Sequence, residues 1–360
     1  MNFLFLAIFS LILSSCSTQS WSELFGGDNP EERNKELMES FGTEEEVLEK
    51  FTESKDAGPS PEPAPVVEKK EKKAPVYKKK KTQRPKKEQA PKKRVATKTE
   101  KQAPAANYPL DYPKELKVMS KSSEILWREF DPKFFTGEKI FMDINYMGIS
   151  TGKIVLSTEK ETVIGETPVY HIHARVKTAD YYRYLYELDD NIDSYISKST
   201  KTPVKFSLIQ RESGQDVDDL QLFDLEKLTT YSFYKRVSGE RTKKKKHEGF
   251  VPKRFSDPLS VIWFLRGLPM DKGKSFKVPI INRGKIIILE AKNEGMETID
   301  TELGKKKAYK MSAFTSYTGE TLKSGKMTFW FSADEKRVFL KFNAKIKIGS
   351  ISGEIKKYKL

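Results

Sequence analysis

The chain has 360 residues, a formal net charge of +15 and one cysteine, Cys16. A single cysteine excludes an intramolecular disulfide and a structural zinc site built from several thiolates. The sequence also lacks a phosphate-binding loop, a dinucleotide fingerprint, a GxSxG elbow and an HExxH motif. We therefore predict that the protein is not an enzyme and needs no cofactor.

The chain begins with an apolar run, FLFLAIFSLIL at residues 3–13, followed by Ser14 and Ser15. Its length of about 11 residues fits the core of a signal peptide and is short of the roughly 20 that span a bilayer. The sequence LSSC that ends at Cys16 resembles the lipobox of bacterial lipoproteins. The resemblance implies that residues 1–15 are a signal peptide that is removed, and that Cys16 carries lipid, such as palmitate. An uncleaved membrane-anchoring helix is the alternative interpretation.

The residue after Cys16 suggests where such a lipid anchor resides. In Gram-negative lipoproteins an Asp at that position commonly favours retention in the inner membrane, and here the residue is Ser17. The resemblance therefore implies the periplasmic leaflet of the outer membrane. Two or more acyl chains hold a protein durably at a bilayer.

Residues 16–56 form an acidic segment in which we predict two short helices. Asn29 and Pro30 are typical of a helix start, and Thr43 with Glu46 three residues later has the pattern of a capping box. Short helices are marginally stable alone. We therefore expect either a small helical hairpin or two helices that form only against a partner.

Residues 57–107 are rich in Pro, Lys and Ala and nearly free of large apolar side chains. Such a composition predicts a disordered linker that holds the rest of the chain away from the membrane. Within it, residues 68–101 contain 16 Lys or Arg and 4 Asp or Glu, a net charge of +12. This charge predicts contact with peptidoglycan, lipopolysaccharide or another polyanion, with a merely solvated spacer as the alternative. The export signal argues against nucleic acid as the partner.

From residue 108 to 360 the sequence predicts a β-rich domain whose core covers residues 137–360. Short apolar or alternating stretches recur between turn signals, as in GEKIFMDINYMGI and RVFLKFNAKIK. About a dozen strands of this length and spacing predict a mainly β fold: an antiparallel barrel, half-barrel or sandwich.

One stretch, FSDPLSVIWFLRGLP, breaks the β pattern and predicts a buried helix at about residues 256–267. Asp257 is the expected N-cap, with a proline directly after it. We expect this helix to close one end of the β domain; the alternative is a lid over an apolar ligand cavity. In that alternative the candidate cavity residues are Ile262, Trp263 and Phe264.

Two histidines, His171 and His173, are two residues apart on a predicted strand, so their side chains point to one face, as two metal ligands would. The third histidine, His247, lies in a charged loop. We favour two surface histidines over a metal site. The aspartate clusters at residues 189–193 and 216–219 are interpreted as loops, strand edges or a weak calcium site.

Three stretches of the β-rich part together resemble a bacterial family catalogued as domain of unknown function 3108. They are GEKIFMDINYMGISTGKIVLS, DPLSVIWFLRGLPMDKGKSFKVPI and MTFWFSADEKRVFLKFNAKIKIGSISGEI, in this order. The resemblance implies an exported or envelope-associated β domain and no established activity.

Two functions remain open from the sequence. The first is a non-catalytic envelope lipoprotein whose β domain interacts with the cell wall or with an envelope protein, spaced from the membrane by the cationic linker. The second is a carrier that binds a lipid or an acyl chain beneath the helix at 256–267.

Overall fold

The computed structural model describes residues 29–54, 108–317, 320–321, 325–346 and 348–360. The predicted lipid site at Cys16 and the basic segment at residues 68–101 lie outside these ranges. Residues 29–54 belong to the same compact unit as the chain from residue 109 onward. Within the described ranges, no helix combines the length and the apolar character needed to cross a membrane.

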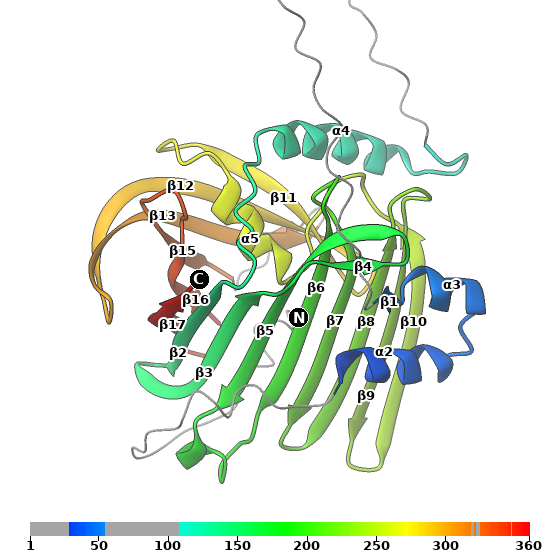
Figure 1. The fold of residues 1–360 in the computed structure, drawn as a ribbon, viewed down its shortest axis with the longest axis horizontal. Coiled ribbons are helices and arrows are strands. Elements are labelled where there is room, and N and C mark those ends of the chain that lie inside the picture. Colours follow the sequence, from blue (N-terminus) through cyan, green and yellow to red (C-terminus); the bar gives the residue numbers. More distant parts are fainter. Residues whose placement is uncertain (1–28, 55–107, 318–319, 322–324, 347) are drawn as a thin grey trace, which may run out of the picture. The chain divides into compact units, whose positions relative to one another are not determined.

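One large antiparallel open sheet dominates this unit (Figure 1), which confirms the predicted mainly β fold. Its strands pair in the order β11 (Ser275–Asn282), β12 (Lys285–Thr301), β13 (Gly304–Tyr317), β15 (Met327–Ser332), β16 (Phe339–Lys345), β17 (Ser350–Lys359), β2 (Lys139–Tyr146), β3 (Ile149–Thr158), β5 (Thr167–Thr178), β6 (Asp189–Ser197), β7 (Pro203–Glu212), β8 (Gln215–Asp224), β9 (Thr229–Ser238) and β10 (Arg241–Phe250). The short strands β4 (Thr162–Ile164) and β1 (Glu53–Ser54) extend it beside β5, and β14 (Glu320–Thr321) pairs with β13.

Successive side chains of each strand point to opposite faces of the sheet. On β5, Ile172 and Ala174 belong to the main hydrophobic core, which also contains the residues of the helix predicted from the sequence. Val169 belongs to a second, smaller apolar cluster. Strands β5, β6, β7 and β8 contribute to both clusters, so this part of the sheet buries apolar side chains on both faces.

The main core is covered by the predicted buried helix, α5 (Ser260–Gly267), which is shorter than the sequence suggested. Asp257 still caps it, because its Oδ1 accepts from the backbone N–H groups of Leu259 (2.8 Å) and Ser260 (2.7 Å). Its other carboxylate oxygen accepts from the hydroxyl of Ser194 on β6. The cap thus also joins the helix to the sheet.

A second helix against the core, α4 (Lys114–Arg128), was not predicted. The indole ring of Trp127, on this helix, stacks on Phe264 of α5 with ring centroids 4.0 Å apart. The sequence carries a signal for it, a stripe of buried residues at helical spacing: Leu116, Ser120, Ser123 and Trp127. A one-turn 3-10 helix, η2 (Asp180–Tyr182), precedes β6.

The two predicted N-terminal helices are present as α2 (Pro30–Glu39) and α3 (Glu45–Lys50). Asn29 caps α2 as expected, since its side chain accepts from the Glu31 backbone N–H at 3.2 Å. The predicted capping box is wrong, because the Thr43 hydroxyl instead donates to the carbonyl of Met38 at 2.8 Å. Figure 1 shows both helices against the sheet, where α2 contacts β7, β8 and β9.

Candidate functional site

Residues 29–54, the N-terminal segment, cover the second apolar cluster of the sheet. The segment contributes three residues that are each only 3% exposed: Leu37, Met38 and Phe51. The sheet contributes Ile164, Val169, Tyr195, Val204, Leu220, Leu222 and Phe233. Burial of three such side chains is worth several kcal/mol, at about 1.5–3 kcal/mol each. The two helices therefore have a partner, and it is the β domain of the same chain.

A buried ion pair lies at the edge of this apolar contact. Lys205 of β7 is 1% exposed, and its Nζ lies 2.7 and 2.9 Å from the two carboxylate oxygens of Glu31 on α2. The same ammonium group donates to the carbonyl of Phe51 at 3.2 Å. A buried ammonium group is costly unless it is paired and hydrogen-bonded. The N-terminal segment supplies both kinds of partner to Lys205.

Further polar contacts fix the position of the segment. The Ser207 hydroxyl donates to the buried side-chain oxygen of Asn34 at 2.8 Å. Lys50 pairs with Asp224 of β8 at 2.8 Å. Burial opposes ionisation of this carboxyl, but the backbone N–H of Lys227 and the contact with Lys50 lower its pKa. Strand β1 adds backbone pairing with β4. The sheet thus contacts the segment through both helices and through β1.

This docking bears on the role expected for the basic segment. The sequence predicted that residues 57–107 hold the β domain away from the membrane. The chain has already reached the β domain by Ser54, however, and it re-enters the same unit at Pro109. Residues 55–107 therefore connect two described parts of one unit.

Beside the docked segment, the sheet brings the two predicted histidines together with a buried aspartate. His171 and His173 lie on β5 and point to one face, as expected. Asp193 of β6 is directly opposite His173, and its Oδ1 lies 2.8 Å from both His171 Nε2 and His173 Nδ1. The histidine side chains are 18% and 22% exposed and the aspartate 3%. The sequence pattern did not indicate Asp193 as their partner.

Charge and stacking hold this cluster in place. Burial opposes the charged form of His171, but the hydrogen bond and the charge of Asp193 outweigh it and raise the pKa of the imidazole. Burial alone would raise the pKa of Asp193, yet the charge of His173 and the two histidine hydrogen bonds lower it. The ring of Tyr195 stacks on His171 with centroids 4.4 Å apart, and its hydroxyl reaches Glu31 at 3.2 Å.

The two predicted aspartate clusters lie on strands β6 and β8, not on loops. Most of these aspartates already have basic or amide partners. Asp189 pairs with Arg175, Asp190 accepts from Gln210, Asp218 pairs with Arg211 and Asp219 pairs with Arg283. Burial raises the pKa of Asp190 and of Asp219. These contacts give the carboxylates a structural use within the sheet.

The candidate cavity residues of α5 lie in the packed core. Trp263 is 2% exposed and its indole N–H donates to Thr158 at 3.2 Å, while Phe264 packs between Trp127 and Phe130. Ile262 is partly buried against the same core. The carrier function beneath α5 remains a prediction.

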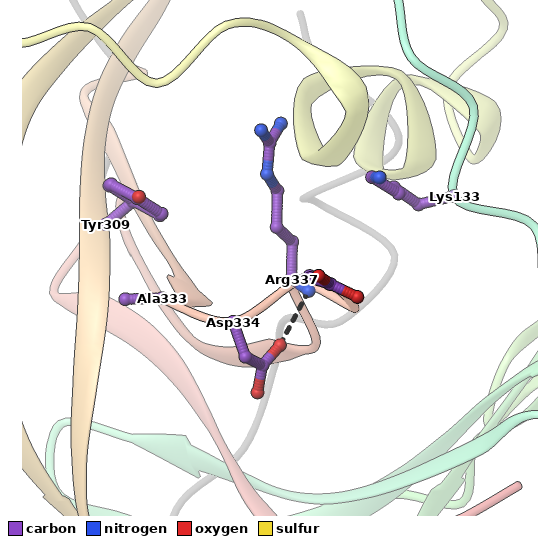
Figure 2. A pocket seen from close by; sticks show the side chains of 6 residues that line it. Lys133, Tyr309, Ala333, Asp334 and Arg337 are labelled. Carbon is purple, nitrogen blue, oxygen red and sulfur yellow. Dashed lines mark hydrogen bonds between the residues drawn. The ribbon is translucent and has the colours of Figure 1, made fainter.

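A pocket of about 530 Å³ lies near the end of α5 (Figure 2) and is lined by Lys133, Tyr309, Ala333, Asp334, Glu335 and Arg337. The Arg337 guanidinium donates to the carbonyls of Arg266 (3.2 Å) and Leu268 (2.6 Å), so it caps the last turn of α5. Its backbone N–H donates to Asp334 at 3.0 Å. Arg337 thus stabilises the helix end, and Ile262, Trp263 and Phe264 do not line this pocket.

Comparison with solved structures found distant similarities. A β-barrel-like protein of domain of unknown function DUF1849 from Brucella abortus aligns with a TM-score of 0.41 and 10% identity, over 62% of this chain and 96% of that one. A protein with a YmcC-like fold from Bacteroides fragilis aligns with a TM-score of 0.28 and 11% identity, over 64% of this chain and 99% of that one. A comparison with curated proteins gave no match. The family described as "Protein of unknown function (DUF3108)" matches residues 142–356, and the chain belongs to this family.

Proposed function

We propose that this protein is a non-catalytic envelope lipoprotein that holds its β domain close to the outer membrane and presents a basic segment to the cell wall. The observation that carries the proposal is the docking of residues 29–54 on the β domain through the buried pair of Lys205 and Glu31. In this proposal Cys16 is the lipid attachment site in the periplasmic leaflet.

Docking makes the tether short. Only residues 17–28, twelve residues, separate Cys16 from the docked segment. A fully extended chain spans at most about 3.3–3.6 Å per residue, so this tether reaches about 40 Å. The β domain is then confined near the membrane surface whatever the length of the basic segment.

In this proposal the basic segment is available to contact other molecules. Its two ends are both attached to the β domain, and residues 68–101 carry a net charge of +12. A second basic surface lies on the described part of the chain, on strand β10, where all residues from Arg241 to Glu248 are exposed and five of them are Arg or Lys. Two cationic surfaces on one tethered domain favour an anionic polymer as partner, and we propose peptidoglycan.

Sedimentation with purified peptidoglycan tests the partner. The matched variant replaces the 16 Lys and Arg residues at positions 68–101 by Gln, which removes the charge and keeps the length. We expect the wild-type chain to sediment at low salt and to be released as salt rises, because screening weakens contacts between exposed charges. The neutral variant, which keeps the basic residues of β10, should sediment clearly less than the wild-type chain. Equal sedimentation of both proteins would contradict the proposal.

Replacement of Cys16 tests the anchor separately. The Cys16→Ser variant should be released from membranes or remain unprocessed, because the acylated thiol is absent. The matched control is Ser17→Ala, which keeps the cysteine. Unchanged processing together with unchanged membrane retention of Cys16→Ser would contradict the lipoprotein assignment.

A further inference from the structure

The cluster of His171, His173 and Asp193 contains two nitrogen donors and one oxygen donor that all lie within 4.8 Å of one another. Each nitrogen is 2.8 Å from the same Asp193 oxygen. The three side chains come from two paired strands, β5 and β6, whose register places Asp193 opposite His173. A rigid sheet therefore holds the three groups together, without a contribution from a loop.

Two of the three donor distances, those from Asp193 to the two histidine nitrogens, are close to those of a tetrahedral zinc site, and the third, between the nitrogens, is at most 4.8 Å. Zinc binds histidine nitrogen at about 2.0–2.1 Å and aspartate oxygen at about 2.0–2.2 Å, which places neighbouring donors about 3.4 Å apart. The two 2.8 Å contacts of Asp193 need to lengthen by only about 0.6 Å. Side-chain rotation of the partly exposed His171 and His173 can supply a change of this size.

A second observation concerns the other oxygen of Asp193. This Oδ2 atom is buried and lacks a hydrogen-bond partner among the described residues. A buried carboxylate oxygen without a partner is uncommon in folded proteins and calls for a ligand, an ion or a water molecule. The carboxylate can bind a cation through either oxygen, so the unused acceptor favours a positively charged ligand.

The surroundings of the cluster are compatible with a cation. The backbone N–H of Glu159 donates to the carbonyl of His171 at 2.8 Å, so a carboxylate-bearing residue is adjacent to the cluster. The ammonium group of Lys205, which lies 5.4 Å from the Tyr195 ring centroid, is already paired with Glu31. The ring of Tyr195 stacks on His171 with centroids 4.4 Å apart, which keeps the imidazole beside Asp193.

We infer that His171, His173 and Asp193 form a binding site for one divalent transition-metal ion, with zinc as the best-fitting ion. Two imidazoles and one carboxylate favour zinc and its neighbours in the transition series over calcium and magnesium, which prefer oxygen ligands. Three protein ligands leave a fourth position open to solvent. The site goes beyond the proposed function, since anchoring and cell-wall contact do not need it.

The competing explanation is a metal-free cluster in which both imidazoles hydrogen-bond to Asp193. Calorimetric titration of the full chain distinguishes the two. The chain is purified in detergent without a polyhistidine tag, treated with a chelator and titrated with zinc chloride. We expect one ion bound per chain, and magnesium chloride should give no such binding. Absence of stoichiometric zinc binding to the folded wild-type chain would overturn the inference, whatever the variants do.

Variants locate the ion. Because loss of a residue that only supports a ligand costs about 10–100-fold in affinity, His171→Ala and Asp193→Asn should each weaken zinc binding by at least about 100-fold. The matched control is His247→Ala, which changes the remaining histidine of the chain and should leave the affinity unchanged. Circular dichroism verifies that each variant is folded. Wild-type affinity in a folded His171→Ala variant would overturn the assignment of this site.

The visible spectrum of bound Co²⁺ provides a second measurement. Cobalt in a tetrahedral site of nitrogen and oxygen donors absorbs far more strongly than octahedral cobalt in water. We expect the strong spectrum in the wild-type chain and in His247→Ala. A weak, octahedral spectrum in the wild-type chain would contradict a tetrahedral site.

Discussion

Lys205 of β7 and Glu31 of α2 are 174 residues apart in the chain, and their side chains form an ion pair of 2.7 Å within a contact that buries the lysine almost completely. The pair joins the segment that follows the predicted lipid anchor to the centre of the sheet. It makes the N-terminal segment part of the β domain.

Loss of the Glu31 charge should loosen the N-terminal segment. The Glu31→Gln variant leaves the buried Lys205 ammonium without its ionic partner, and we expect a loss of about 2–4 kcal/mol in the free energy of unfolding. Hydrogen exchange should become faster across residues 29–54. The control is Glu32→Gln, which changes an exposed neighbour on the same helix. Equal exchange in the two variants would contradict the ion pair.

The apolar half of the docking contact can be tested on α2. Leu37 is 3% exposed, so Leu37→Ala should destabilise the protein by about 3 kcal/mol through lost burial and a cavity. Chemical denaturation measures the change. Glu39→Ala, an exposed position on the same helix, should alter stability by less than about 0.5 kcal/mol. A Leu37→Ala variant as stable as Glu39→Ala would show that α2 does not cover the sheet.

The cap of α5 should make stability depend on pH. Burial raises the pKa of Asp257 to about 6 from an ordinary value of 3.8. The folded state then binds a proton more readily than the unfolded state between about pH 4 and pH 6, so this group's contribution to stability falls as pH rises through that range. A shift of this size corresponds to about 3 kcal/mol.

The Asp257→Asn variant isolates this contribution. An asparagine side-chain oxygen can still accept from the helix N–H groups, and its amide does not titrate. We expect the stability difference between wild type and variant to change by about 2.4 kcal/mol between about pH 4 and pH 7 in urea titrations. Asp271→Asn, at an exposed position, is the control. A difference that stays constant with pH would contradict the prediction.

A second buried pair fixes the far end of α5. Arg266 and Glu138 are 1% and 0% exposed and are joined by two contacts of 2.6 and 2.7 Å. Glu138→Gln or Arg266→Met alone should lower the free energy of unfolding by about 3–5 kcal/mol, because each variant leaves a buried charge without its partner. The double variant should lose clearly less stability than the sum of the losses in the two single variants.

An exposed pair provides the comparison for that cycle. Arg33 and Glu36 form a 3.2 Å ion pair on the surface of α2, with side chains 41% and 58% exposed. Their double-mutant cycle should give a coupling below about 1 kcal/mol. If the two pairs had equal coupling energies, burial would not explain the coupling energy of Arg266 and Glu138.

The features that could be predicted from the sequence are those that depend on the local residue pattern. The alternation of apolar residues predicted the strands, and Asn29 with Pro30 predicted the start of α2, because both signals act within a few residues. The capping box at Thr43 failed since the threonine hydroxyl found a closer acceptor at Met38. The helix α4 was missed although its buried residues have helical spacing, because two of them are serines.

The candidate site depended on contacts between distant segments. The spacing of His171 and His173 predicted that they share a face, but the choice of Asp193 as partner depends on the register of β5 with β6. A register shift of one residue would turn Asp193 to the opposite face. The pairing of Lys205 with Glu31 depends on the folded sheet in the same way, and neither residue is distinguished by its sequence neighbours.

Cleavage of the basic segment tests the central claim most directly. The full chain in detergent receives one inserted protease recognition site after residue 80 and is cut there. If residues 29–54 are docked on the sheet, the two fragments should remain together in size-exclusion chromatography at low and at high salt, and Glu31→Gln should weaken their association. Separation of the wild-type fragments under native conditions would show that the N-terminal segment is not part of the β domain.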